Sequence, residues 1–208
     1  MIPLDILSVF AVTSILLALA PGSDNIFVLT QSALFGWREG LLVTLGLCCG
    51  IIVHTTAVSL GVAAIFQASA LAFSVLKTAG IAYLLYLAWG AFRAGAQDLG
   101  ETVSPRLTAR QLFTRGIVMN LTNPKVAIFF LAFLPQFTDP ARGAIVPQML
   151  LLGAVFVASA MPVFAAIALT AGRLGNWLRK SAHAQRMLNR VAGSIFVLLA
   201  GGLAVSSR

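Results

Sequence analysis

The segment Gly116–Phe137, GIVMNLTNPKVAIFFLAFLPQF, places Lys125 inside an otherwise apolar stretch. Near the N-terminus, Ala20–Asn25 (APGSDN) places Asp24 inside a second apolar stretch in the same way. A charge in hydrocarbon costs at least a few kcal/mol, so such a residue is kept where it is paired or used. Each charge also lies beside a proline-containing break. Two broken, charge-bearing spans in the two halves of a chain are typical of a transporter's binding site.

The composition indicates a membrane protein. Hydrophobic residues make up 59% of the 208 residues and charged residues only 10%, whereas roughly a quarter of the residues in soluble domains are charged. The net charge of +8 does not indicate nucleic acid, because the basic residues lie between apolar stretches, where they set membrane orientation. No other segment is long enough to bury a soluble core, so we expect one membrane domain and no nucleic-acid partner.

Six apolar stretches predict six membrane-spanning segments, at about 5–35, 40–66, 70–92, 116–137, 143–172 and 190–206. The first is longer than the ~20 residues that a simple span requires. Its Pro21-Gly22 pair predicts two half-helices around an irregular joint, which must be buried in protein or line a polar cavity. The first residues, MIPLD, include no basic residue, so we expect residues 1–35 to be a retained span and not a signal peptide.

The two halves of the chain resemble each other and predict a repeat. KTAG at Lys77–Gly80 opens the third stretch, RVAG at Arg190–Gly193 opens the sixth, and Pro21 aligns with Pro124. Three spans per half is an odd number, so the second copy must enter the membrane upside down. We therefore expect an all-α integral membrane protein of six transmembrane helices, built as two inverted three-helix repeats with helices 1 and 4 broken. The expected parts are repeat one (about 1–92), a cytoplasmic connection (about 93–115) and repeat two (about 116–206).

The basic residues predict the orientation. Ten of them lie in the connections after the first, third and fifth stretches: Arg38, Arg93, Arg106, Arg110, Arg115, Arg173, Arg179, Lys180, Arg186 and Arg190. Three lie on the opposite side: Lys77, Arg142 and Arg208. Because cytoplasmic loops carry an excess of Lys and Arg, both termini are expected outside the cytoplasm. The three tryptophans lie near span ends on the basic side, as an aromatic belt would have them.

Four segments together resemble the LysE/RhtB family of bacterial amino-acid exporters. They read APGSDNIFVLTQSALFGWREG, GIIVHTTAVSLGV, LKTAGIAYLLYLAWGAFR and NLTNPKVAIFFLAFLPQF. The resemblance implies a six-span secondary transporter in the bacterial inner membrane that expels amino acids, driven by the proton-motive force. One position departs from the family pattern, because Ser23 stands where a second proline usually follows Pro-Gly. Ser23 restores a backbone N–H and adds a hydroxyl to the predicted polar site.

An amino-acid substrate is a zwitterion, so the site must offer groups to both charges. Asp24 can accept the substrate ammonium, take up the driving proton, or cap the half-helix that begins at Asn25. Lys125 can hold the substrate carboxylate, pair with Asp24, or lock two helices together as a structural ion pair. The half-helix that starts at Pro124 directs the positive end of its dipole at the same region. The other residues expected in the substrate- and proton-binding site are Pro21, Gly22, Ser23, Asn25, His54, Asn120, Asn123 and Gln136.

His54 shares one face of the second span with small residues. Gly46, Gly50, His54, Ala57 and Gly61 fall within about 80° of one another at helical spacing. Small residues let helices approach closely in membranes, so His54 is expected to point into the bundle. There it can relay protons or serve only as a hydrogen-bonded interhelical residue. Glycine-rich faces of the second and sixth spans would also suit a homodimer.

The sequence leaves three other functions open. An exporter of a metal cation or other small solute would use Asp24, His54 and the cysteines, but Cys49 and His54 lie roughly 140° apart on one helix. An intramembrane protease would need a second buried aspartate or a Ser/His pair with an oxyanion hole. A channel would need no charge-switching pair. We expect a transporter with no enzymatic activity, cofactor or bound metal, whose repeats rock about the site while Asp24 takes up and releases a proton.

Overall fold

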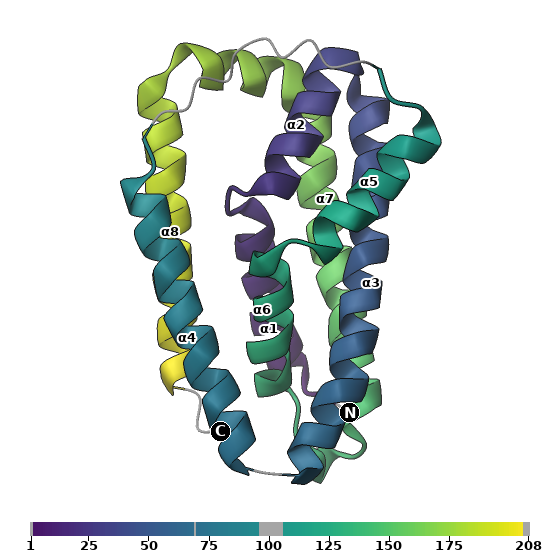
Figure 1. Cartoon of the computed structure of the whole chain (residues 1–208), viewed down its shortest axis with the longest axis vertical. Coiled ribbons are helices and arrows are strands. Elements are labelled where there is room, and N and C mark those ends of the chain that lie inside the picture. The colour runs from purple at the N-terminus through teal and green to yellow at the C-terminus, as the bar shows by residue number, and fades with distance from the viewer. Residues whose placement is uncertain (1, 69, 96–105, 206–208) are drawn as a thin grey trace.

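The computed structural model describes residues 2–68, 70–95 and 106–205. Within these ranges the regular elements are helices (Figure 1). The first half contains α1 (Leu4–Leu19), α2 (Ser23–Phe35), α3 (Trp37–Ala68) and α4 (Ala70–Arg93). The second half contains α5 (Ala109–Leu121), α6 (Pro124–Ala132), the 3₁₀ helices η1 (Leu134–Phe137) and η2 (Pro140–Arg142), α7 (Ile145–Lys180) and α8 (Ala182–Val205).

Both predicted breaks are present. The chain bends by 61° between α1 and α2 and by 53° between α5 and the segment Pro124–Phe137. In the described ranges, four helices are long and apolar enough to cross a membrane, and six spans result if each bent pair counts as one. The prediction of an all-helical membrane protein is therefore confirmed, including the two broken helices. Both breaks lie near mid-height of the molecule (Figure 1).

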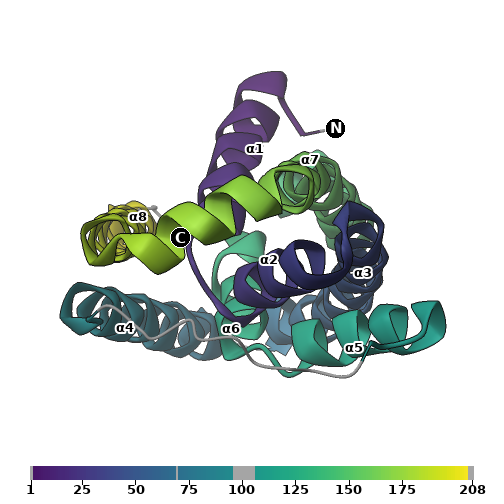
Figure 2. The same cartoon turned by 90° about the horizontal axis from the view of Figure 1, so that it is seen from above.

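Two helices begin earlier than hydropathy predicted, because polar caps set their starts. α5 begins at Ala109, where Thr108 and Gln111 form a capping box, a motif that satisfies backbone N–H groups at a helix start. α8 begins at Ala182, and Ser181 Oγ accepts a hydrogen bond from the N–H of Ala184. The last turns of α7 lie across one end of the molecule and lead into α8 (Figures 1 and 2).

Close backbone packing joins α3 to α5. A Cβ atom on Gly46 would collide with the carbonyl oxygen of Phe113, and one on Gly116 would collide with that of Val43. Gly50 lies directly beside Asn120. The predicted small-residue face therefore makes contacts at its N-terminal half, whereas a Cβ on Gly61 would meet nothing within 4 Å.

A cluster of aromatic side chains fills the half of the molecule that contains the start of α1. Its members come from α1, α6, η1 and α7: Phe10, Phe129, Phe130, Phe133, Phe137 and Phe156. The ring centroids of Phe129 and Phe133 are 4.9 Å apart, and those of Phe130 and Phe156 are 5.0 Å apart. Five of the six are nearly inaccessible, while Phe137 is partly buried against them. This aromatic cluster fills the space between α1, α6 and α7 below the two breaks.

The opposite end carries the basic residues and the tryptophans. Arg38 lies over Trp37 at the start of α3, and Arg93 lies over Trp89 at the end of α4, at 5.4 and 4.4 Å from the ring centroids. Arg106 donates to Glu39 across 2.7 Å. The start of α1 and the end of α8 both lie at the other end of the molecule (Figure 1).

Candidate functional site

The joints of the two broken helices meet near the centre of the molecule. α2 begins after Gly22, which is extended, and α6 begins after Asn123, whose side-chain oxygen accepts from the N–H of Lys125 at 3.0 Å. Pro124 occupies the first turn of α6, where the missing N–H of proline removes no helical hydrogen bond. Both half-helices thus start at the joints, and helix N-termini carry partial positive charge.

Asp24 is held by three side-chain donors. Its Oδ1 accepts from Asn123 Nδ2 at 2.9 Å and from Ser23 Oγ at 3.1 Å, while its Oδ2 accepts from Asn120 Nδ2 at 3.3 Å. Only 2% of Asp24 is exposed. Since Asn120 and Asn123 flank the second break, Asp24 ties the start of α2 to the joint between α5 and α6.

Lys125 caps the end of α1. Its Nζ donates to the carbonyl oxygen of Ala20 at 2.9 Å and lies 3.5 Å from that of Leu17. The last carbonyls of a helix have no partner within the helix, so these bonds satisfy groups that the break leaves open. Gly22 permits the approach, because a Cβ at this position would lie 3.0 Å from Nζ.

Asp24 and Lys125 do not pair with each other. Among the described residues, the ion pairs within 4.0 Å are Arg106–Glu39 and Arg142–Asp139. The two central charges are instead bound by amides and carbonyls from both halves of the chain. The direct pairing that was one of the sequence-based alternatives for Lys125 is absent in this conformation.

Two further predicted residues contact the joints. Asn25 Nδ2 donates to the carbonyl oxygen of Ala18 at 2.7 Å. His54 Nε2 lies 3.2 Å from the carbonyl oxygen of Asn120, and its ring stacks on Phe130 with centroids 6.1 Å apart. The side-chain oxygens of Asn25 and Asn120 are buried without a hydrogen-bond partner in the described structure. His54 therefore points toward the joint between α5 and α6, as expected.

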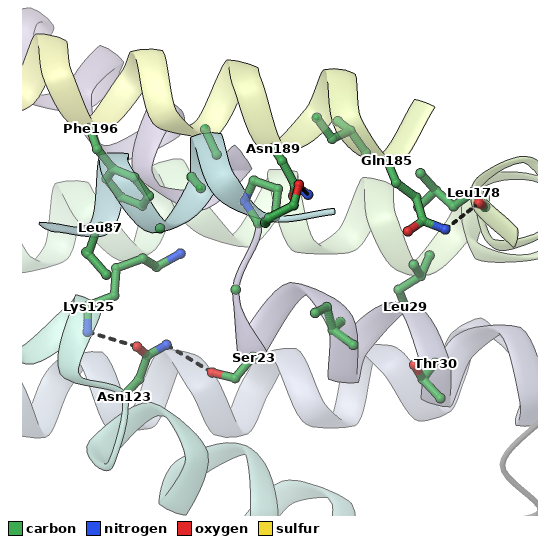
Figure 3. A pocket seen from close by; sticks show the side chains of 18 of the residues that line it. Ser23, Leu29, Thr30, Leu87, Asn123, Lys125, Leu178, Gln185, Asn189 and Phe196 are labelled. Carbon is green, nitrogen blue, oxygen red and sulfur yellow. Dashed lines mark hydrogen bonds between the residues drawn. The ribbon is translucent and has the colours of Figure 1, made fainter. Parts of the chain in front are cut away.

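A cavity of about 970 Å³ extends from the joints toward the end that carries the basic residues. Its inner end is formed by Pro21, Gly22, Ser23, Asn123, Pro124 and Lys125. Figure 3 shows Lys125 beside Leu87 and Phe196, with Asn189 and Gln185 farther along the wall. The cavity thus combines a small polar end with a mainly apolar passage, as ligand sites usually do.

The structure divides the predicted site residues into two groups. Ser23, Asn123 and Lys125 line the cavity, whereas Asp24, Asn25, Asn120 and His54 are not among its lining residues. Gln136 lies in η1, and its Nε2 is 3.5 Å from the carbonyl oxygen of Ala132. It is therefore apart from both groups.

The wall formed by α4 and α8 was not predicted. On α8 it includes Gln185, Asn189, Ala192 and Phe196, which share one face at helical spacing. The polar residues on this face, Gln185 and Asn189, could have indicated from the sequence that α8 lines a cavity. The predicted start of the sixth span near residue 190 left them outside the membrane segment.

No group of three or more His, Cys, Asp or Glu side chains in the described residues could hold a metal ion. Cys48 is buried and Cys49 is partly buried, and both are free thiols.

This arrangement of broken apolar helices around buried charges is that of a membrane transporter. The family model described as LysE type translocator matches residues 15–207, so the chain belongs to that family and the resemblance found in the sequence is confirmed. Membership in this family supports an exporter of amino-acid-type compounds, as does similarity to a relative named an efflux protein.

Several curated proteins are similar to this chain. A protein of Salmonella typhimurium named homoserine/homoserine lactone efflux protein is 38% identical over 200 residues, which cover 96% of this chain and 95% of the relative. An uncharacterized membrane protein of Vibrio cholerae is 35% identical over 90% of this chain and 91% of its own length. A membrane protein of Pseudomonas aeruginosa is 29% identical over 86% and 85%. No solved structure matches the chain.

Proposed function

We propose that the protein is a secondary active exporter that moves amino acids of the homoserine type out of the cytoplasm by proton antiport. The observation that carries this proposal is the position of Lys125 at the inner end of the cavity, beside the starts of α2 and α6. An ammonium group has three N–H donors, and Lys125 uses its bonds to α1 carbonyls to hold its place. A remaining N–H and two positive helix ends favour a substrate carboxylate at this point.

Asp24 is proposed as the proton site. Both of its oxygens already accept hydrogen bonds, and it does not line the cavity. A carboxylate outside the cavity cannot contact the substrate ammonium directly in this conformation, so of the two functional alternatives from the sequence we assign Asp24 the proton role. Outward-facing, Asp24 takes up a proton; inward-facing, it releases the proton and the substrate binds.

An inverted repeat accounts for the way the elements pair. α4 packs against α8 and α3 against α7, which would be equivalent helices of the two repeats. The starts of α2 and α6 align Ser23 with Pro124 and Asp24 with Lys125. This register differs by two residues from an alignment of the two prolines. The two central charges would then occupy equivalent positions in repeats of opposite direction.

The two repeats differ in how closely their half-helices α6 and α2 pack against α4 and α8, and this difference supports alternating access. α6 packs against α4, where a Cβ on Gly80 would collide with Ala132. The cavity instead separates α2 from α8, since Leu29 and Leu188 both line it. We assign this conformation as inward-facing, with the basic end in the cytoplasm and both termini outside. In the other state α2 would close on α8 and α6 would part from α4.

The bacterial inner membrane is the proposed location, and a homodimer the proposed assembly. Within the part of the chain that the structure describes, Gly61, Gly201 and Gly202 have no neighbouring atom within 4 Å of an added Cβ, so these glycines would leave room for a second copy.

The test is efflux from cells preloaded with a panel of amino acids that includes homoserine, measured with and without an uncoupler. We expect uncoupler-sensitive export, lost in Lys125→Ala and retained in Lys77→Ala, which removes a lysine far from the joints. If well-expressed protein exports no amino acid, the substrate belongs to another class, such as a metal cation.

A further inference from the structure

The Asp24 carboxylate is buried beside the cavity but does not line it. Ser23 lines the cavity, whereas Asp24, the next residue on α2, does not. Its Oδ2 receives a bond from Asn120, which is 1% exposed and lies against Gly50 of α3. A residue that reaches both can couple a proton on Asp24 to a substrate in the cavity.

Asn123 is such a residue. Its Nδ2 donates to Asp24 Oδ1 at 2.9 Å and lies 3.3 Å from Ser23 Oγ, while its Oδ1 accepts from the backbone N–H of Lys125 at 3.0 Å. Figure 3 shows this side chain between Ser23 and Lys125 at the cavity's inner end. The carboxylate requires a donor and the N–H requires an acceptor, so the two contacts fix the orientation of the amide.

We propose that Asn123 is the positioning residue that couples protonation of Asp24 to the substrate cavity, through the start of α6 and Lys125. This inference rests on the proton role proposed for Asp24. It assigns Asn123 a part in energy coupling, in addition to any contact with the substrate.

The physical reason is the change in hydrogen bonding when Asp24 loses its charge. Bonds to an ionised acceptor are roughly twice as strong as those between neutral groups. A neutral acid must also donate its proton, and each Asp24 oxygen faces an amide N–H, one from Asn123 and one from Asn120. The Ser23 hydroxyl beside Oδ1 can turn to accept that proton, which leaves the bond from Asn123 with an uncharged acceptor. Protonation therefore weakens the bond that holds Asn123, and with it the cap that fixes the first turn of α6.

Two other titratable groups face this network. Lys125 lies on α6, and His54 on α3 contacts the carbonyl oxygen of Asn120. α5 carries its arginines, Arg110 and Arg115, in its first two turns. α7 has no charged residue before Arg173. The positive charge of Lys125 thus compensates the negative charge of Asp24, and neutral donors stabilise the carboxylate by hydrogen bonds.

The informative variant is Asn123→Ser. Serine keeps an oxygen that can cap α6, but its side chain is too short to reach Asp24. Protein reconstituted in vesicles would be assayed with labelled homoserine in two ways: accumulation driven by an imposed pH gradient, and homoserine exchange without a gradient. We expect the ratio of driven accumulation to exchange to fall at least about ten-fold, the effect of losing one charge-assisted hydrogen bond.

Asn189→Ser is the matched control. Asn189 lines the same cavity, but its Nδ2 donates to the carbonyl oxygens of Ala94 and Gly95 at 3.3 and 3.4 Å. The change deletes an amide from the cavity without touching Asp24. Driven accumulation and exchange should change together, so their ratio should stay that of the parent.

A second readout covers the case in which Asn123→Ser folds poorly. Asn123→Thr also keeps a capping oxygen and lacks the amide N–H, and proton release on homoserine binding can be followed in weakly buffered detergent solution. The parent should release protons, whereas either variant should bind homoserine with little release. A parent-like ratio or parent-like proton release would overturn the coupling role. A parent protein that exchanges homoserine but ignores the pH gradient would overturn the antiport itself and the coupling with it.

Discussion

At the residue scale, the joint satisfies backbone and side-chain groups that the two breaks leave without helical partners. Lys125 donates to the end of α1, Asn25 donates to Ala18, and Asn123 caps α6. Because unpaired polar groups inside a membrane cost several kcal/mol each, these side chains stabilise the breaks as well as form the site. Function and folding therefore depend on the same few hydrogen bonds.

Gly22→Ala should weaken substrate binding with little effect on folding. The backbone at Gly22 is extended, so alanine fits the conformation, but its Cβ would lie 3.0 Å from Lys125 Nζ and displace the ammonium. We expect a several-fold increase in the KM for homoserine efflux. Gly90→Ala, at a cavity position where an added Cβ meets nothing within 4 Å, should leave KM near that of the parent. Equal KM values for both variants and the parent would show that the position of Nζ is unimportant.

Asp24→Asn should abolish uphill efflux while sparing part of the exchange activity. Asparagine preserves the shape of the side chain but cannot carry the proton proposed to drive transport. Efflux against a homoserine gradient and exchange in its absence should be measured on the same preparation. A variant that still builds a gradient would move the proton role elsewhere, with His54, next to Asn120, as the next residue to test.

At the element scale, close contact between α3 and α5 holds the second joint in place. Gly46 and Gly116 bring the two backbones together, so the end of α5, with Asn120, lies against Gly50 and His54. Helices that approach this closely in membranes gain van der Waals packing that larger residues prevent. The position of the Asp24 network thus depends on glycines that lie about one helical turn from Asn120 and Gly50.

Gly46→Ala should destabilise the protein, and Gly61→Ala should not. Both replace a glycine in the same helix with the best helix former, which by itself favours the helix by up to about 1 kcal/mol. At Gly46 the new Cβ would collide with the Phe113 carbonyl, whereas at Gly61 it meets nothing within 4 Å. Overpacking of this kind costs typically about 1–3 kcal/mol, so the thermal unfolding midpoint in detergent should fall for Gly46→Ala alone. Parallel shifts in both variants would exclude close packing as the cause.

At the scale of the whole molecule, the cavity lies on one side of the joints and the aromatic cluster on the other. The cavity extends toward the basic end, and the cluster includes Phe10 of α1 on the other side. A transporter with one closed and one open side exposes its site to a single compartment at a time. The distribution of basic residues decides which compartment that is.

Thiol labelling can test both the open side and the orientation. In a background without Cys48 and Cys49, Thr30→Cys would place a thiol in the cavity, and Ala141→Cys would place one in exposed η2 at the opposite end. A membrane-impermeant reagent should modify the Thr30→Cys thiol only in inside-out vesicles and the Ala141→Cys thiol only in intact, right-side-out cells. The reverse pattern would invert the proposed topology, and labelling at Thr30→Cys from both sides would indicate a channel.

Local sequence was sufficient to predict the apolar spans, the two breaks and the residues gathered at them. Hydropathy and proline act locally: apolar length predicts a span, and Pro21-Gly22 and Asn123-Pro124 each favour a break because proline lacks the backbone N–H and glycine is conformationally free. The caps at Thr108 and Ser181 are also local features of the sequence. Hydropathy did not reveal these two helix starts, because polar residues in the first turns lower the averaged hydropathy there. Asp24, Asn123, Lys125 and His54 were therefore predicted as neighbours.

Which of those neighbours line the cavity and which are buried beside it depends on the packing of the whole bundle. The rotation of each helix and the contact of distant segments set whether a side chain faces the cavity or the interior, and neither follows from spacing along one helix. Asp24 and Lys125 could have formed an ion pair, but the side chains around them direct Asp24 toward Asn120 and Lys125 toward Ala20. The wall of α4 and α8 opposite Lys125 depends likewise on packing between residues about a hundred positions apart in the chain.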